Sequence, residues 1–224
     1  MHENYKKDIV EHTYNTNVKS IFKHDYTSSR AVYLDDEFVY KVFIRDKMVD
    51  QNEMFFKNYH GDLKLLDVFK DDECTIFKFN KLPGTSINQL ADEDVTLSLD
   101  TLTKWFKDQV KHIHLAGVQC YKKYDEFKIK QDPWEQGFVY AFFDWNPTNY
   151  IYDKTTNKLY LVDLEPTNWI PRNAWNCVIR DHYRNFIQSF NHITLDDKEY
   201  ITQLEDSVHQ QLNEEIPLFL ACPA

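Results

Sequence analysis

Acidic and amide side chains that could take part in catalysis or bind a metal are concentrated in two short segments, FFDWNPTN at 142–149 and LYLVDLEPT at 159–167. Asp144 stands five positions before Asn149 and nineteen before Asp163. Carboxylate and amide oxygens are the ligands that Mg²⁺ prefers, and phosphoryl transfer needs metal ligands together with a group that orients or deprotonates the acceptor hydroxyl. The spacing therefore suggests phosphoryl transfer, with Asp144 as the candidate base and Asn149 and Asp163 as candidate magnesium ligands.

The elements around these residues are predicted to be short strands between helices. Apolar runs within 141–164 indicate β-structure, and Trp145 to Pro147 interrupt it, so that Asp144 begins a short loop. Apolar residues recur at three- and four-residue intervals from Leu102 to Ile113, with Gly117 placed as a C-terminal stop. Further helices are predicted over 175–190 and 195–213.

The sequence of the first third of the chain predicts strands and one helix. Alternating runs in 18–45 predict an antiparallel meander, 46–60 predicts a helix, and 63–71 and 74–80 predict two further strands. A Pro83-Gly84 turn then marks a boundary. We therefore expect an α+β fold with two lobes of one domain: an N-terminal lobe over 1–82, with a small antiparallel sheet and one helix, and a mainly helical C-terminal lobe over 83–224.

The two acidic segments resemble the catalytic and metal-binding loops of the protein-kinase-like superfamily, and within it the aminoglycoside/choline phosphotransferase branch. The matching positions include Pro147 and Glu165 beside the three residues named above. The resemblance implies a two-lobed kinase-like fold that uses ATP and Mg²⁺. It implies that Asp144 is the base, that Asn149 and Asp163 hold magnesium, and that Glu165 is a supporting acid near the metal.

The same resemblance assigns nucleotide-binding roles in the N-terminal lobe. Lys41 in FVYKVFI matches the strand lysine that contacts the α- and β-phosphates, and Glu53 matches the helix glutamate that pairs with it. The backbone from Phe79 to Lys81, before Leu-Pro-Gly, would contact the adenine edge. The chain has four glycines and no glycine-rich phosphate loop, so Ser28 and Ser29 are the candidate phosphate ligands there.

Three functions are compatible with these motifs. The first is an ATP- and Mg²⁺-dependent phosphotransferase acting on a hydroxyl of a small molecule or sugar, with a lipopolysaccharide-core sugar kinase as a looser match. The second is a protein kinase with a Ser, Thr or Tyr acceptor. The third is an inactive kinase-like binding or regulatory module, although the retention of Lys41, Asp144, Asn149 and Asp163 favours activity.

Composition excludes several other classes. A formal net charge of −10 argues against nucleic acid as a partner. No apolar run approaches the eighteen residues of a membrane span, and the charged N-terminus lacks a signal-peptide core, so we expect a cytoplasmic protein. The four cysteines are widely spaced, which favours free thiols. The acceptor, the choice between ATP and GTP, and the oligomeric state stay open.

Overall fold

The computed structural model describes residues 5–20, 30–44, 49–91, 94–123, 138–140, 144–164, 169–190 and 198–220. Ser28, Ser29 and Glu165 lie outside these ranges, so the roles expected of them remain predictions. The chain divides into two compact units. Unit 1 comprises Met1–Lys57 and Asp62–Leu82, and unit 2 comprises Asn58–Gly61 and Pro83–Ala224.

Unit 1 is built on a five-stranded sheet in which every neighbouring pair is antiparallel, with the order β1-β2-β3-β5-β4. The predicted strands and their meander are confirmed. The strands are β1 (Lys19–Ser20), β2 (Arg30–Leu34), β3 (Phe38–Ile44), β4 (Leu65–Lys70) and β5 (Cys74–Asn80). Because β3 and β5 have a neighbouring strand on each side, they bury side chains on both faces of the sheet, such as Val42 and Phe43 of β3.

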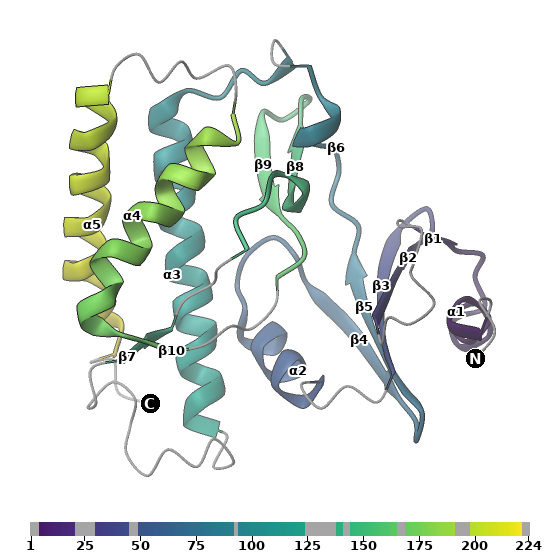
Figure 1. The fold of residues 1–224 in the computed structure, drawn as a ribbon. Coiled ribbons are helices and arrows are strands. Elements are labelled where there is room, and N and C mark those ends of the chain that lie inside the picture. Colours follow the sequence, from purple (N-terminus) through teal and green to yellow (C-terminus); the bar gives the residue numbers. More distant parts are fainter. Residues whose placement is uncertain are drawn as a thin grey trace. The chain divides into compact units, whose positions relative to one another are not determined.

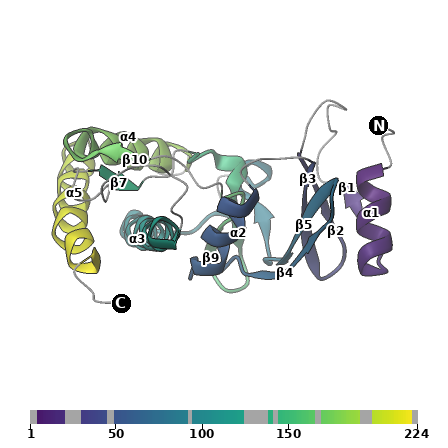
Figure 2. The same ribbon diagram turned by 90° about the horizontal axis from the view of Figure 1, so that it is seen from below.

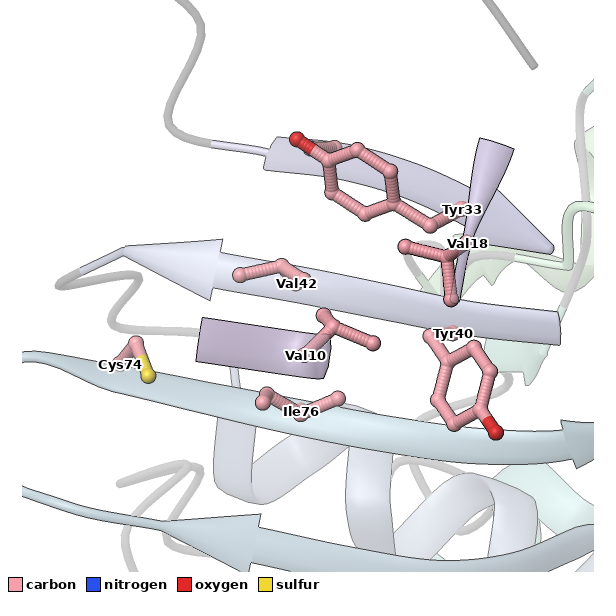
Figure 3. Packing of buried hydrophobic residues seen from close by; sticks show 8 residues of the cluster. Val10, Val18, Tyr33, Tyr40, Val42, Cys74 and Ile76 are labelled. Atoms are coloured by element: carbon pink, nitrogen blue, oxygen red, sulfur yellow. The ribbon is translucent and has the colours of Figure 1, made fainter. Parts of the chain in front are cut away.

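Two helices cover the opposite faces of this sheet (Figure 2). The predicted helix is α2 (Val49–Asn58), whereas α1 (Tyr5–Tyr14) was not expected from the polar N-terminal sequence. The α1 helix has a single fully buried residue, Val10, in a core that it shares with the strands (Figure 3). The other members of this core are Val18, Ala31, Tyr33, Tyr40, Val42, Cys74 and Ile76.

Unit 2 contains three long helices, α3 (Leu99–Lys123), α4 (Arg172–Gln188) and α5 (Lys198–Leu220), which pack against one another (Figure 1). The prediction that Gly117 ends α3 is wrong, because the helix continues to Lys123. A glycine inside a helix costs only about 1 kcal/mol relative to alanine. The burial of the neighbouring Ala116 and Val118 offsets that cost.

Short strands complete unit 2 and confirm the expected α+β class. One three-stranded sheet has the order β6-β8-β9, and a separate pair joins β10 to β7. The bounds are β6 (Thr85–Ser86), β7 (Phe138–Tyr140), β8 (Tyr150–Asp153), β9 (Lys158–Leu161) and β10 (Trp169–Pro171), with a 3₁₀ helix η1 at Ile87–Gln89.

Two further findings concern the cysteines and the helices of the described ranges. Cys74 is a buried free thiol and Cys177 is an exposed one. Among the helices that the structure describes, none combines the length and apolarity that crossing a membrane requires.

Candidate functional site

The β8–β9 hairpin brings Asn149 and Asp163 to the same end of one small sheet. Tyr150, the first residue of β8, is paired with Leu161, the last residue of β9. The pairing extends one step further, because the Val162 amide donates to the Asn149 carbonyl oxygen at 2.8 Å. Asp163 follows Val162 directly, so antiparallel pairing places both candidate metal ligands at this end of the hairpin.

Asp144 and Asn149 are in direct contact. The Asn149 Nδ2 donates to Asp144 Oδ2 at 2.9 Å and to the Asp144 carbonyl oxygen at 3.2 Å. Asn149 is only 6% exposed, whereas Asp144 is exposed. The buried amide therefore holds one oxygen of the candidate base in place, while the rest of the Asp144 carboxylate faces solvent.

The DWNPTN sequence folds locally into a capped turn, which explains how the five-residue spacing closes. Pro147 begins the 3₁₀ helix η4 (Pro147–Asn149), where its fixed φ angle suits the first helical position. The side chain of Asn146 accepts from the Thr148 amide at 3.0 Å and from its hydroxyl at 2.9 Å. This cap turns the chain so that Asn149 returns to Asp144.

Trp145 anchors the loop in the aromatic core of unit 2. Its side chain is 6% exposed, and its ring centroid lies 4.5 Å from that of Phe106 on α3 and 6.0 Å from that of Phe186 on α4. The sequence indicated only that Trp145 interrupts regular structure. An anchoring role could have been inferred from its position. Trp145 follows an acidic residue and precedes a turn, and predicted helices with apolar faces lie on both sides of this segment in the sequence.

Asp163 adopts a left-handed backbone conformation, with φ of 46°. Such a conformation is uncommon for a residue other than glycine, although aspartate tolerates it better than most, and it often occurs at functional sites. The conformation breaks the strand direction immediately after β9.

A pocket of about 350 Å³ opens beside Asp144. It lies between the Asp144 loop and the C-terminal end of α4. The described residues that line it are Asp144, Trp145, Asn146, Pro147, Asn185, Gln188 and Ser189. Asn185 and Gln188 of α4, and Ser189 directly after this helix, were not among the residues predicted from the sequence. The sequence feature that could have indicated them is the set of polar residues that flank Phe186 and Ile187, which are buried.

Two buried titratable groups lie close to the loop. Burial, with the Asp144 charge adding to it, raises the pKa of Tyr150 well above its ordinary value. Burial lowers the pKa of His182 to about 4, against the opposing effect of Asp181. The centroid of the His182 ring lies 6.3 Å from that of the Trp145 ring, so this histidine is a packed core residue that is neutral at neutral pH.

No group of three or more His, Cys, Asp or Glu side chains with metal-binding geometry occurs among the residues that the structure describes. The predicted metal site relies instead on one amide and one carboxylate, Asn149 and Asp163, with Glu165 outside the described ranges. Hard Mg²⁺ is commonly held by one or two carboxylates together with water and substrate phosphates, so this small donor set suits it.

In unit 1, Lys41 lies on the face of the sheet that α2 covers. Lys41 pairs with Phe77 of β5, and paired residues share a face. The Phe77 ring contacts Phe56 of α2, with centroids 6.3 Å apart. The half-buried Lys41 and the helix that carries Glu53 therefore belong to the same side of the sheet.

The Glu53 carboxylate is bonded to two other lysines. Lys57 Nζ contacts its Oε1 at 2.5 Å, and Lys70 Nζ of β4 contacts its Oε2 at 2.6 Å. Burial alone would raise the pKa of Glu53, but the hydrogen bonds from Lys57 and Lys70 bring it below its ordinary value. The expected pairing of Glu53 with Lys41 stays a prediction, and Lys70 is a partner that the sequence analysis missed.

The backbone of the predicted adenine-contacting segment, Phe79–Lys81, is hydrogen-bonded to other parts of unit 1. Phe79 is paired with strands on both sides, the Asn80 amide donates to the Lys64 carbonyl at 3.3 Å, and the Lys81 amide donates to the Glu37 carbonyl at 3.1 Å. The amides of Asn80 and Lys81 are thus engaged within unit 1. Adenine recognition at Phe79–Lys81 stays a prediction, and other groups of the segment would have to provide it.

Unit 1 also has a pocket of about 480 Å³ at the end of α1. It lies on the α1 face of the sheet, opposite the face that carries Lys41, and none of the predicted site residues that the structure describes lines it. Its lining consists of residues 14–17, 35–38, Tyr40 and Lys78.

Comparison with known proteins gives structural matches only. No protein-family model matches the sequence, and no curated protein sequence matches it. Monomeric WbdD matches with a TM-score of 0.43 and 14% identity over 81% of this chain and 44% of its own. An aminoglycoside-3'-phosphotransferase of type VIII matches with a TM-score of 0.45 and 11% identity over 91% of this chain and 99% of its own.

A third match is the aminoglycoside phosphotransferase APH(3'')-Id from Streptomyces rimosus, with a TM-score of 0.43 and 12% identity over 92% of this chain and 87% of its own. The chain spans less than half the length of the WbdD chains. The phosphotransferase group that the sequence motifs resemble thus reappears among the structural matches. Every quoted TM-score is below 0.5.

Proposed function

We propose that the protein is a phosphotransferase that moves the γ-phosphoryl group of ATP to a hydroxyl of a small molecule or sugar. The observation that carries this proposal is the contact between Asp144 and Asn149 at the end of the β8–β9 hairpin, where Asp163 also lies. Phosphoryl transfer asks a protein mainly for positioning and charge stabilisation. A fixed base beside two oxygen ligands meets those requirements.

The proposed roles combine the contacts of Asp144 and Asn149 with the roles that the motif resemblance implies for Asp163 and Glu165. Asp144 accepts the proton of the acceptor hydroxyl, because its carboxylate is exposed beside a pocket. Asn149 orients Asp144 through its Nδ2, which leaves its Oδ1 as a ligand for Mg²⁺. Asp163 supplies the second oxygen ligand and Glu165 supports it. The metal, when bound, neutralises charge on the phosphates.

Unit 1 supplies the nucleotide contacts in this proposal. Lys41 contacts the α- and β-phosphates, and Glu53 restrains the lysines on the α2 face of the sheet. Phe79–Lys81 contacts adenine, and Ser28 and Ser29 contact phosphate. Lys41 is the residue of this set whose charge binds the phosphates most directly, so it gives the clearest test of nucleotide binding.

Thermal unfolding with MgATP tests nucleotide binding. A ligand present at a hundred times its Kd stabilises the native state by about 2.7 kcal/mol, which corresponds to a Tm increase of roughly 5–10 °C for a chain of this size. We expect that shift for the wild type, a much smaller one for Lys41→Met, and a full shift for Lys64→Met, whose side chain is exposed. The absence of a wild-type shift at millimolar MgATP would favour the inactive-module alternative.

Transfer is tested with radiolabelled ATP against sugars, alcohols, aminoglycosides and protein extracts. Label in a small molecule supports the proposal. Label found exclusively in protein would instead identify a protein kinase.

A further inference from the structure

We propose that the pocket beside Asp144 binds an uncharged, polyhydroxylated acceptor such as a neutral sugar or cyclitol, and that Asn185 and Gln188 of α4 determine this specificity. This inference rests on the proposed function and names its substrate class. It is carried by the types of side chain that the structure gathers around the candidate base.

The polar side chains at the C-terminal end of α4, together with Ser189 directly after it, lie on one side of the chain. Asn185, Gln188 and Ser189 occupy positions i, i+3 and i+4, which lie on one side of a helix. Phe186 is fully buried and Ile187 is 1% exposed, whereas Asn185 and Gln188 are exposed. The apolar side of this helical turn thus packs into the core, and its polar side lines the pocket.

Among the described residues that line the pocket, Asp144 is the one with an ionisable side chain. The other polar members are the amides of Asn146, Asn185 and Gln188 and the hydroxyl of Ser189. An amide carries both donors and acceptors and so matches a hydroxyl, which also does both. Vicinal hydroxyls of a sugar ring can therefore be satisfied by this set.

An acceptor with several ammonium groups would fit this lining poorly. An ammonium ion offers donors alone, and removing it from water is costly unless a carboxylate compensates its charge. Asp144 is the single carboxylate among the described lining residues, and in the proposed reaction it receives the acceptor proton. The positive charge of the neighbouring Arg184 is compensated by Glu205. Its Nε donates to Glu205 Oε1 at 2.5 Å and its Nη2 donates to Glu205 Oε2 at 2.7 Å.

The volume of the pocket also fits a small acceptor. At about 350 Å³ it lies near the lower end of the range for small-molecule sites, which suits one sugar ring rather than a multi-ring compound.

In the reaction, the acceptor oxygen forms a bond to the γ-phosphorus. The bond from that phosphorus to the β–γ bridging oxygen breaks, the hydroxyl proton passes to Asp144, and ADP leaves.

A matched set of acceptors tests the inference. ADP formation from MgATP is measured with D-glucose, D-glucosamine and N-acetyl-D-glucosamine, alongside other neutral hexoses, myo-inositol and kanamycin. We expect one or more neutral compounds to stimulate turnover, and the amino counterpart of a good neutral acceptor to have at least tenfold lower kcat/KM. Preference for the amino compounds, or no stimulation by any neutral acceptor, would overturn the inference.

Two variants and a control locate the specificity. Asn185→Ala and Gln188→Ala should each raise the KM for the neutral acceptor roughly tenfold, with a smaller effect on kcat, because each removes hydrogen bonds to bound acceptor. Gln203→Ala, an exposed amide on α5, should change neither constant. Asn185→Asp should raise the glucosamine-to-glucose ratio of kcat/KM, since it adds a carboxylate.

The outcomes separate this inference from the proposed function. Acceptor-free hydrolysis of ATP by the wild type, with water in the acceptor place, reports phosphoryl transfer itself. If the wild type turns over ATP but the Asn185 and Gln188 variants keep the wild-type KM, the pocket assignment is wrong and the proposed function stands. If the wild type turns over no ATP with or without acceptors, both are wrong.

Discussion

Removing the hydroxyl of Tyr150 should stabilise the protein. The Tyr150 side chain is fully buried among aromatic rings, with centroid distances of 5.8 Å to Trp105 and 5.5 Å to Phe186. Its hydroxyl has no hydrogen-bond partner within the described part of the chain. Burial of an unsatisfied hydroxyl costs about 1–3 kcal/mol, so Tyr150→Phe removes a cost while keeping the ring and its packing.

The net gain should be smaller than that cost, because the oxygen also makes van der Waals contacts that the variant loses. We expect an increase of about 1 kcal/mol in the free energy of unfolding, equivalent to a Tm increase of roughly 2–4 °C at this chain length. All five tryptophans lie after residue 83, in unit 2. Tryptophan fluorescence during urea unfolding therefore reports the unit that contains Tyr150.

Tyr152 gives the matched control two residues away. It is 2% exposed, and its hydroxyl donates to Asn157 Oδ1 at 2.6 Å. Tyr152→Phe breaks that bond and should destabilise unit 2 by about 1 kcal/mol. If Tyr150→Phe destabilises to the same extent as Tyr152→Phe, then the Tyr150 hydroxyl is bonded in the native protein and our reasoning about it is wrong.

Three further predictions concern a turn, a histidine and an ion pair. Gly84→Ala should lower the urea midpoint strongly, because Gly84 has φ of 114° and an added Cβ would lie 2.4 Å from the Tyr152 carbonyl oxygen; an unchanged midpoint would contradict this. Burial lowers the pKa of His182 to about 4, so the unfolded state binds more protons than the native state between pH 6.5 and about 4. The free energy of unfolding should therefore fall by about 3 kcal/mol as the pH is lowered through this range. His182→Gln should flatten this dependence of the unfolding free energy on pH. The pKa of Glu53 is lowered overall by Lys57 and Lys70 despite burial, so its contribution is present above its unfolded pKa and lost as pH falls; circular dichroism should show Glu53→Gln destabilised at pH 7 and equal to the wild type in strong acid.

The sequence was most informative where local patterns decide the structure. The alternating runs predicted the strands of unit 1, and the apolar stripe from Trp175 to Phe190 predicted α4, because burial of one face imposes these periods. The DWNPTN spacing predicted that Asp144 and Asn149 act together, since a proline and a capping asparagine close the turn locally.

Features that depend on partners distant in sequence were missed. The α1 helix shows little apolar pattern because it buries only Val10 completely, and its stability comes from the sheet beneath it. Lys70 reaches Glu53 from a strand seventeen residues later, a pairing that spacing within a helix cannot indicate. The pocket lining of α4 depends on where Trp145 fixes the Asp144 loop, which is a consequence of tertiary packing.

The central claim is that Asp144 and Asp163 serve one metal-dependent phosphoryl-transfer site. Its most direct test is the rate of MgATP turnover by the wild type, Asp144→Ala and Asp163→Ala, with melting curves to confirm that all three are folded. General-base catalysis typically contributes 10²–10⁴-fold, so we expect Asp144→Ala to lose about that factor and Asp163→Ala to lose metal-dependent turnover. Equal rates in all three folded proteins would contradict the assignment of both residues.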